Sequence, residues 1–85
     1  MAPLPPLTFD EFRRFVSDVL EIAEPALTPQ THFVHDLTVD SLKIVELMVQ
    51  LEVILGHRIP SDVAWEILTM DDAYQYYLRT ASRER

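Results

Sequence analysis

Ser41, which follows Asp40, is a hydroxyl-bearing residue at the start of an expected helix, and the first question is whether it could act as a nucleophile. A nucleophilic serine needs a general base that activates it and donors that stabilise the oxyanion. The sequence has neither a Gly-x-Ser-x-Gly motif nor a histidine and an acid at a recognisable spacing. Ser41 is therefore a poor candidate for a catalytic nucleophile. Taken alone, it is an ordinary serine at the start of a helix.

The other reactive residue types offer little further chemistry. The sequence contains no cysteine, which excludes disulfides, thiolate metal sites and cysteine nucleophiles. His32, His35 and His57 lack the spacing of metal ligands on a helix, so we expect surface or loop positions for them and no metal site. A small enzyme is accordingly the weakest of the functional hypotheses.

The composition is typical of a single globular domain. Hydrophobic residues make up 48% of the 85 residues and charged residues 25%, which is enough apolar surface for one compact core. There is only one glycine, and leucine, glutamate, alanine and arginine are plentiful. Runs of alternating β-branched and aromatic residues, which would indicate strands, do not occur. We therefore expect an all-α fold.

The net charge of −7 favours basic partner surfaces, although it could equally serve solubility alone. It would repel nucleic acid and anionic lipid. The segment from Met1 to Leu7 lacks a basic region and is interrupted by prolines, so it does not resemble a signal peptide, and no apolar run is long enough to span a bilayer. We expect a monomeric, cytoplasmic protein that binds neither nucleic acid nor membrane.

Capping signals predict the first two helices. Thr8-Phe9-Asp10-Glu11 fits a capping box, and the apolar periodicity behind it predicts a helix over roughly residues 9–23, which Glu24-Pro25 ends. Asp40 is a good N-cap for a second helix that runs from Ser41 to Gly56.

The remaining segments predict a long loop and two further helices. Residues 25–39 lose the helical period, and apolar side chains should pin this loop to the core: Leu27, Phe33, Val34 and Leu37. Ser61 or Asp62 can cap a short third helix near Val63 to Leu68, and Thr69-Met70-Asp71-Asp72 caps a fourth. The expected buried stripe of the fourth helix is Met70, Ala73, Tyr74, Tyr77, Leu78 and Ala81.

The helix from Ser41 to Gly56 carries two apolar arcs when its residues are placed at about 100° intervals. The wider arc suits the core and comprises Ile44, Leu47, Met48, Leu51 and Leu55. A separate stripe comprises Leu42, Val45, Val49 and Val53. Either the helix is buried on most sides or the second stripe is an exposed docking surface, and the position of the stripe beside Ser41 favours docking.

The segment Phe33-Val34-His35-Asp36-Leu37-Thr38-Val39-Asp40-Ser41-Leu42, followed by Val45-Glu46-Leu47 and Leu51-Glu52, resembles the acyl carrier protein family. The resemblance covers most of the chain, including the turn that ends in Ile59-Pro60. It implies a four-helix bundle with a long loop between the first two helices and a short third helix. It also implies a flexible leader at residues 1–7, a carrier domain at residues 8–82 and a tail at residues 83–85.

By this resemblance, a phosphopantetheinyl transferase joins 4′-phosphopantetheine from coenzyme A to Ser41 through a phosphodiester. The thiol of the arm would carry acyl groups as thioesters to acyl-loading, ketosynthase or acyltransferase-type enzymes, so the protein would be a carrier and not a catalyst. Asp40 and Leu42 match positions that transferases recognise, although Asp40 can equally be a plain N-cap. The residues expected to dock partner enzymes are Val45, Glu46, Val49, Glu52 and Val53. The two glutamates could instead be solvated charges.

Three departures from the family pattern bear on the partners. Thr38 stands where family members usually have a glycine, Lys43 where an acidic residue is common, and Val53 where a carboxylate is frequent. The second helix is thus less acidic than in fatty-acid carriers. This favours partners from a dedicated pathway, such as polyketide or other specialised biosynthesis.

Two hypotheses of the same fold remain beside the acyl carrier. One is an aminoacyl or peptidyl carrier of a nonribosomal peptide pathway, which Asp40 before the serine disfavours. The other is an interaction module without an arm. We expect Trp65, Tyr74 and Tyr77 to pack in the core, with a contact of Trp65 or Tyr74 to the cargo as the alternative.

Overall fold

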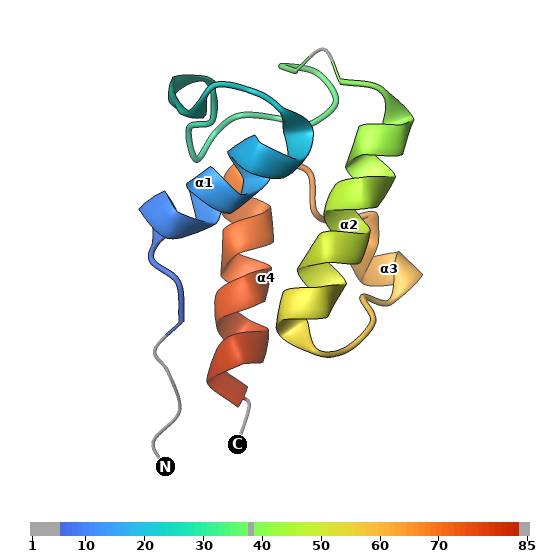
Figure 1. The fold of residues 1–85 in the computed structure, drawn as a ribbon. Coiled ribbons are helices and arrows are strands. Elements are labelled where there is room, and N and C mark those ends of the chain that lie inside the picture. Colours follow the sequence, from blue (N-terminus) through green and yellow to red (C-terminus); the bar gives the residue numbers. More distant parts are fainter. Residues whose placement is uncertain (1–5, 38, 84–85) are drawn as a thin grey trace.

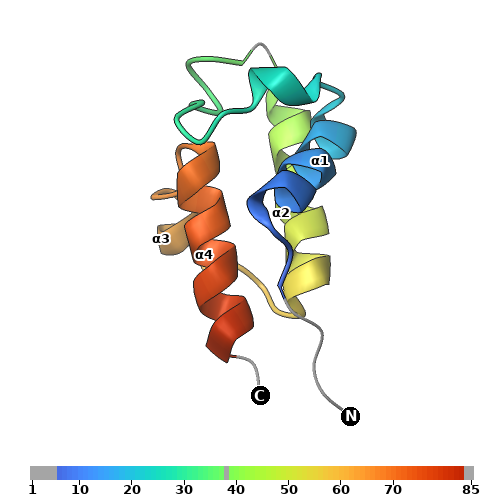
Figure 2. The same ribbon diagram turned by 90° about the vertical axis from the view of Figure 1, so that its left-hand side faces the viewer.

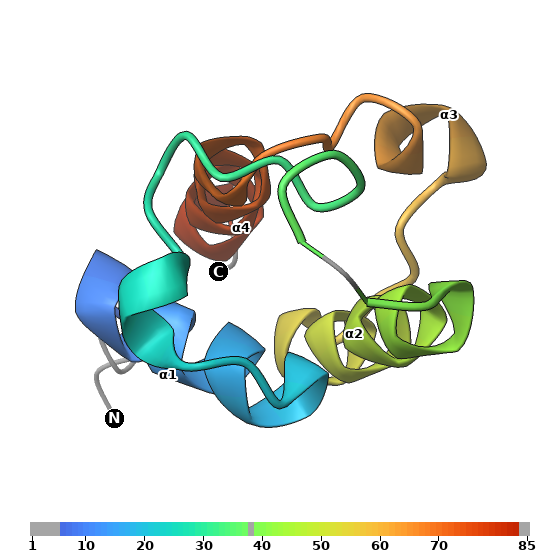
Figure 3. The ribbon, with the colours of Figure 1, turned by 90° about the horizontal axis from the view of Figure 1, so that it is seen from above.

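The computed structural model describes residues 6–37 and 39–83, which form four α-helices. These are α1 (Phe9–Leu20), α2 (Ser41–Leu55), α3 (Ser61–Ala64) and α4 (Met70–Arg83), with a 3₁₀ turn at Glu24–Ala26. α1 packs against α2 and α4, and α2 packs against α4. Figures 1 and 3 show α3 at the outer edge of this group, next to α2 and away from α1. The expected all-α, four-helix fold is confirmed.

The long loop between α1 and α2 covers one end of the bundle. Figure 2 shows it passing over the beginnings of α2 and α4, while α4 ends at the opposite end. Leu27 and Phe33 of this loop are buried and Leu37 is half-buried, as expected. Val34 is 68% exposed, so its predicted role as a core anchor is wrong. Thr38 lies outside the described residues.

α1 begins at the predicted capping box but ends earlier than predicted. The Thr8 hydroxyl accepts a hydrogen bond from the Glu11 amide at 3.2 Å, and the Glu11 carboxylate accepts one from the Thr8 amide at 2.9 Å. The helix ends at Leu20 because Glu21 adopts a left-handed backbone conformation with φ of 59°. The amides of Glu21 and Ile22 both return to the Ser17 carbonyl, which closes the helix there.

α3 lies earlier in the chain than predicted. It spans Ser61–Ala64, so the range Val63 to Leu68 is wrong, and Ser61 belongs to the helix while Pro60 holds the N-cap position without a side-chain hydrogen bond. After the helix, the amides of Glu66 and Ile67 bond to carbonyls three residues back instead of four, and the Leu68 carbonyl accepts a hydrogen bond from the Phe33 amide at 2.9 Å, so this segment leaves the helix and joins the long loop. An isolated antiparallel bridge joins His32 and Thr69 beside this bond.

α4 begins at the predicted cap. The Thr69 hydroxyl accepts a hydrogen bond from the Asp72 amide at 3.1 Å, and the Asp72 carboxylate accepts one from the Thr69 amide at 3.1 Å. Of the expected stripe, three residues are buried and two half-buried: Met70, Ala73 and Tyr77, then Tyr74 and Leu78. The side chain of Ala81 lies outside the described residues. Tyr76 is also buried, which the predicted stripe missed.

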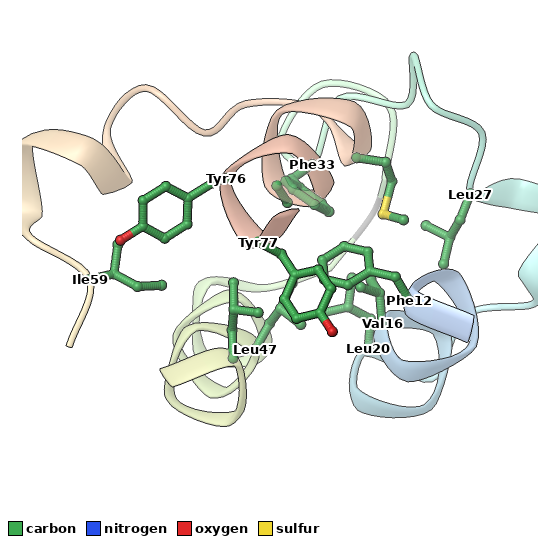
Figure 4. Packing of buried hydrophobic residues seen from close by; sticks show 12 residues of the cluster. Phe12, Val16, Leu20, Leu27, Phe33, Leu47, Ile59, Tyr76 and Tyr77 are labelled. Carbon is green, nitrogen blue, oxygen red and sulfur yellow. The ribbon is translucent and has the colours of Figure 1, made fainter. Parts of the chain in front are cut away.

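The core lies between α1, α2 and α4. Its buried side chains include Phe12, Val16 and Leu20 from α1 and Leu47 from α2 (Figure 4). The rings of Phe12 and Tyr77 stack with centroids 5.4 Å apart, and Figure 4 shows Tyr76 directed instead toward Ile59. Tyr76 therefore extends the core toward the segment that precedes α3.

Leu7 is fixed to α4 by two hydrogen bonds. Its amide donates to the Tyr77 hydroxyl at 2.8 Å, and its carbonyl accepts from the Tyr74 hydroxyl at 2.9 Å. The last residue of the expected leader is thus held against α4, and residues 1–5 and 84–85 lie outside the described residues. Among the helices that the structure describes, none is both long and apolar enough to cross a membrane.

Candidate functional site

Ser41 is the first residue of α2, and its side chain is exposed. Asp40 precedes it in an extended conformation, and the Asp40 carboxylate accepts a hydrogen bond from the Lys43 amide at 3.1 Å. This confirms Asp40 as the N-cap. The backbone carbonyl of Asp40 accepts a further hydrogen bond from the Ile44 amide at 3.4 Å. The Ser41 hydroxyl thus lies in solvent at the positive end of a 15-residue helix.

The second apolar arc of α2 is exposed along its whole length. The exposed fractions are 76% for Leu42, 57% for Val45, 51% for Val49 and 69% for Val53. We call these four residues the exposed stripe. The core arc faces inward, with Leu47 and Leu51 buried and with Ile44, Met48 and Leu55 packed against the core. The stripe therefore takes no part in holding the described bundle together, and it begins immediately after Ser41.

The two carboxylates of α2 have partners within the chain. Glu46 lies 3.7 Å from the Lys43 ammonium. Glu52, which we expected to be a docking residue or a solvated charge, is half-buried and accepts a hydrogen bond from the Ile59 amide at 2.8 Å. Sequence patterns could not have indicated the Glu52 contact, because Ile59 lies beyond the turn that follows the helix.

Lys43 joins α2 to the end of α1. Its ammonium donates a hydrogen bond to the Glu21 carboxylate at 3.0 Å, and it also approaches Glu46. The hydrogen bond to Glu21 is the main cause that raises the pKa of Lys43 above its ordinary value of 10.5, so this side chain stays charged at neutral pH. Lys43 departs from the family pattern in sequence, but no sequence pattern indicated that its partner would be Glu21 at the end of α1.

An apolar pocket of about 190 Å³ lies on the other side of α2. Its walls include Ile44, Leu47 and Met48 of α2 together with Phe33 of the loop and Trp65 after α3. Trp65 is 82% exposed, so the expectation that it packs in the core is wrong. It is exposed because α3 ends one residue before it and lies at the edge of the bundle.

Tyr74 and Tyr77 lie on α4 against the core, and His32 lies in the long loop. Tyr77 packs in the core as expected, and half-buried Tyr74 contacts Phe12 with ring centroids 5.3 Å apart. Tyr74 is not among the pocket residues. His32 lies in the loop, where its Nδ1 accepts hydrogen bonds from the amides of Val34 and His35 at 3.1 Å each.

The comparison with protein families matches residues 10–76 to the phosphopantetheine attachment site family. An acyl carrier protein of Lactobacillus acidophilus is 37% identical over 68 residues, which are 80% of this chain and 85% of that protein. The chain belongs to the acyl carrier protein family. Relatives of the same name from Rubrobacter xylanophilus, 36% identical over 78% of this chain and 82% of theirs, and Helicobacter pylori, 34% identical over 80% and 87%, agree with this.

Membership in this family makes the protein a carrier and not an enzyme, with covalently attached phosphopantetheine as its cofactor. Its partners are a phosphopantetheinyl transferase and enzymes that act on the carried group. The phosphopantetheine group supplies a thiol, which this cysteine-free chain lacks. The residues at the head of α2 fit such a group, because an exposed hydroxyl lies where backbone amides and the helix dipole favour a phosphate.

Proposed function

We propose that the phosphopantetheine arm is attached to the Ser41 hydroxyl and carries acyl groups as thioesters. The observation that supports this best is the exposed hydroxyl at the first position of α2, directly after a capping aspartate. A phosphodiester formed there keeps one negative charge next to the positive end of the helix dipole, which stabilises the product. The long α2 also provides a rigid base for the arm.

Asp40 and Leu42 flank Ser41, and we propose that the transferase recognises both residues. Asp40 keeps the start of α2 in place through its hydrogen bond to the Lys43 amide, and its carboxylate is exposed. Leu42 is 76% exposed, and a leucine gains nothing in the described fold from that position. A contact with a partner explains its placement.

The docking surface proposed for partner enzymes comprises Val45, Glu46, Val49, Glu52 and Val53. Its three valines belong to the exposed stripe, which an enzyme would bury while it holds the arm. We assign the partners to acyl-loading, ketosynthase or acyltransferase-type enzymes. We place them in polyketide, fatty-acid-like or other specialised biosynthesis, since Lys43 and Val53 make α2 less acidic than in fatty-acid carriers.

Mass spectrometry tests the attachment site. The purified chain is incubated with coenzyme A, Mg²⁺ and a transferase of broad carrier specificity, beside the variants Ser41→Ala and Ser61→Ala. Ser61 is a matched control because it too is an exposed serine at the first position of a helix, α3. We expect one phosphopantetheine on the wild type and on Ser61→Ala, and none on Ser41→Ala. Modification of Ser41→Ala, or none of the wild type, would refute the proposal.

The variant Asp40→Asn separates recognition from capping. Asparagine caps helices about as well as aspartate, so the helix content should not change. If the transferase reads the charge, the rate of modification falls while circular dichroism stays the same. An unchanged rate would show that Asp40 is only a cap.

A further inference from the structure

The side chain of His32 holds the tip of the long loop, by which we mean Val34, His35 and Asp36. The Nδ1 atom of His32 accepts hydrogen bonds from the amides of Val34 and His35, both at 3.1 Å. The His32 amide donates to the Asp36 carboxylate at 2.8 Å, and the His32 carbonyl accepts from the Asp36 amide at 3.0 Å. The loop tip therefore folds back on His32, and two of the hydrogen bonds that hold it there end on one imidazole nitrogen.

Only a neutral imidazole can make both side-chain hydrogen bonds. A neutral ring has one N–H group and one bare nitrogen that accepts, whereas a protonated ring has two N–H groups and no acceptor. Because Nδ1 of His32 is the acceptor, the hydrogen of the neutral ring must lie on Nε2. A proton taken up from solvent at Nδ1 would replace two hydrogen bonds by N–H groups that face one another. The contact is therefore sensitive to pH.

The residues on either side of the loop tip differ in how they are held. Before it, the Phe33 amide donates to the Leu68 carbonyl at 2.9 Å, and the Phe33 side chain is buried in the core. The Thr31 carbonyl accepts a hydrogen bond from the Met70 amide at 3.0 Å. Val34, by contrast, is exposed, and it forms part of the wall of the apolar pocket of about 190 Å³. Loss of the imidazole contact would thus free the chain from Val34 onward and open one side of the pocket.

The charged and titratable groups on the neighbouring elements do not supply another acceptor for these two amides. The long loop passes over the beginnings of α2 and α4 (Figure 2). These groups are His35 and Asp36 in the loop, Asp40 and Lys43 at the start of α2, Glu66 after α3, and Asp71 and Asp72 at the start of α4. The carboxylates favour a proton on His32, whereas a charged His35, with its ring centroid 4.3 Å away, would oppose it. Lys43 is bound to Glu21 instead. The cost of the proton therefore falls on the two amide contacts.

We propose that His32 is a proton-sensitive latch on the apolar pocket. Neutral His32 holds Val34 at the wall of the pocket, and a proton on Nδ1 releases the loop tip. Phe33 keeps its hydrogen bond to Leu68, so the core stays closed while the rim of the pocket opens. The latch goes beyond the carrier function and does not depend on the arm. It is therefore tested on the unmodified chain, and a failure of attachment at Ser41 would leave it untouched.

Nuclear magnetic resonance of the full chain tests the latch directly. At about pH 8 the imidazole nitrogens of His32 should show the hydrogen on Nε2, and a hydrogen on Nδ1 would refute the proposal. Between about pH 8 and pH 5.5 the protection of the Val34 and His35 amides from hydrogen exchange, corrected for the intrinsic rate, should fall about five-fold. The Phe33 amide should stay protected. The methyl signals of Val34 should shift with the same midpoint as the His32 ring.

The informative variant is His32→Asn, with His35→Gln as its matched control. An asparagine side chain accepts a hydrogen bond from the amide two residues on and does not titrate, so the Val34 amide should stay protected at both pH values. His35→Gln removes the neighbouring ring but keeps the latch, and it should respond to pH as the wild type does. If His32→Asn responds like the wild type, or if His35→Gln abolishes the response, the proposal is wrong. Should His32→Asn fail to fold, the ring hydrogen of His32 and the response of His35→Gln decide.

Discussion

The Glu52 carboxylate accepts a hydrogen bond from the Ile59 amide at 2.8 Å and so ties the last turns of α2 to the segment before α3. Between them, Gly56 ends α2 in a left-handed conformation with φ of 81°. Ile59 is buried beside Tyr76 (Figure 4). The glutamate therefore holds the turn that carries Ile59 into the core, besides any contact it makes with an enzyme.

Replacing Glu52 by alanine should destabilise the protein. The half-buried amide contact of Ile59 would be lost, at a cost of about 1–2 kcal/mol in the free energy of unfolding. Glu52→Gln should lose less, since the glutamine oxygen can still accept the hydrogen bond. Urea denaturation measures both, with Glu46→Ala as a control expected within about 0.5 kcal/mol of wild type. Equal effects of Glu52→Ala and Glu46→Ala would contradict a structural role for Glu52.

The left-handed residue at the end of α1 predicts an unusual order of two variants. Glu21→Gly and Glu21→Ala both remove the ion pair with Lys43, but only glycine adopts a positive φ without strain. Glu21→Gly should therefore be more stable than Glu21→Ala by about 1 kcal/mol. Thermal and urea unfolding of the pair check this. The reverse order would mean that α1 does not end at Leu20 in solution.

Tyr74 should make stability depend on pH in the alkaline range. Its burial, followed by the nearby Tyr77 and Glu11, raises the pKa of Tyr74 above its ordinary value of 10.0. The folded state therefore favours the protonated phenol, and the resulting stability is present below pH 10 and is lost as the pH rises through the higher folded-state pKa.

The variant Tyr74→Phe isolates this contribution. Below pH 9 it should be less stable than wild type by about 0.5–1.5 kcal/mol, because the hydrogen bond to the Leu7 carbonyl is lost. Above pH 10 its stability should fall less steeply than that of the wild type. The raised pKa of Lys43 acts in the same direction but is present in both proteins, so it cancels in the comparison. Parallel pH profiles would contradict the prediction.

Trp65 is the only tryptophan of the chain, and its exposure can be read by fluorescence. Acrylamide should quench it in the folded protein almost as strongly as in urea. An acyl chain that returned from Ser41 into the 190 Å³ pocket would pass next to Trp65 and reduce the quenching. Comparing a long acyl group with an acetyl group on the arm tests this contact. Equal quenching with both would exclude Trp65 as a cargo contact.

The parts of the fold that local chemistry specifies were predictable from the sequence. Thr8 with Glu11, Asp40, and Thr69 with Asp72 start three of the helices where expected, because a cap depends on residues within one turn. The position of Ser41 at the head of α2 followed from the Asp40 cap.

The features that depend on tertiary contacts were not predictable. α1 ends at Glu21, which adopts a left-handed backbone conformation. The sequence has no glycine at this position that would have indicated such an end. α3 ends at Ala64, and the segment after it is held instead by a residue far away in the sequence, since the Phe33 amide donates a hydrogen bond to the Leu68 carbonyl. As a result Trp65 lies at the surface, although its type suggests the core. The hydrogen bond from the Ile59 amide to the Glu52 carboxylate is likewise a tertiary contact, because it joins α2 to the segment beyond the following turn.

The arrangement of the helices also has a practical consequence. α2 begins beneath the long loop, whereas α4 ends at the opposite end of the bundle (Figures 1 and 2). A sensor chip, resin or fluorescent protein coupled beyond α4 would therefore leave the serine facing the bulk solution. Enzymes that bind this protein could then be captured and counted on an oriented layer of it, because the attachment point of the arm would stay accessible.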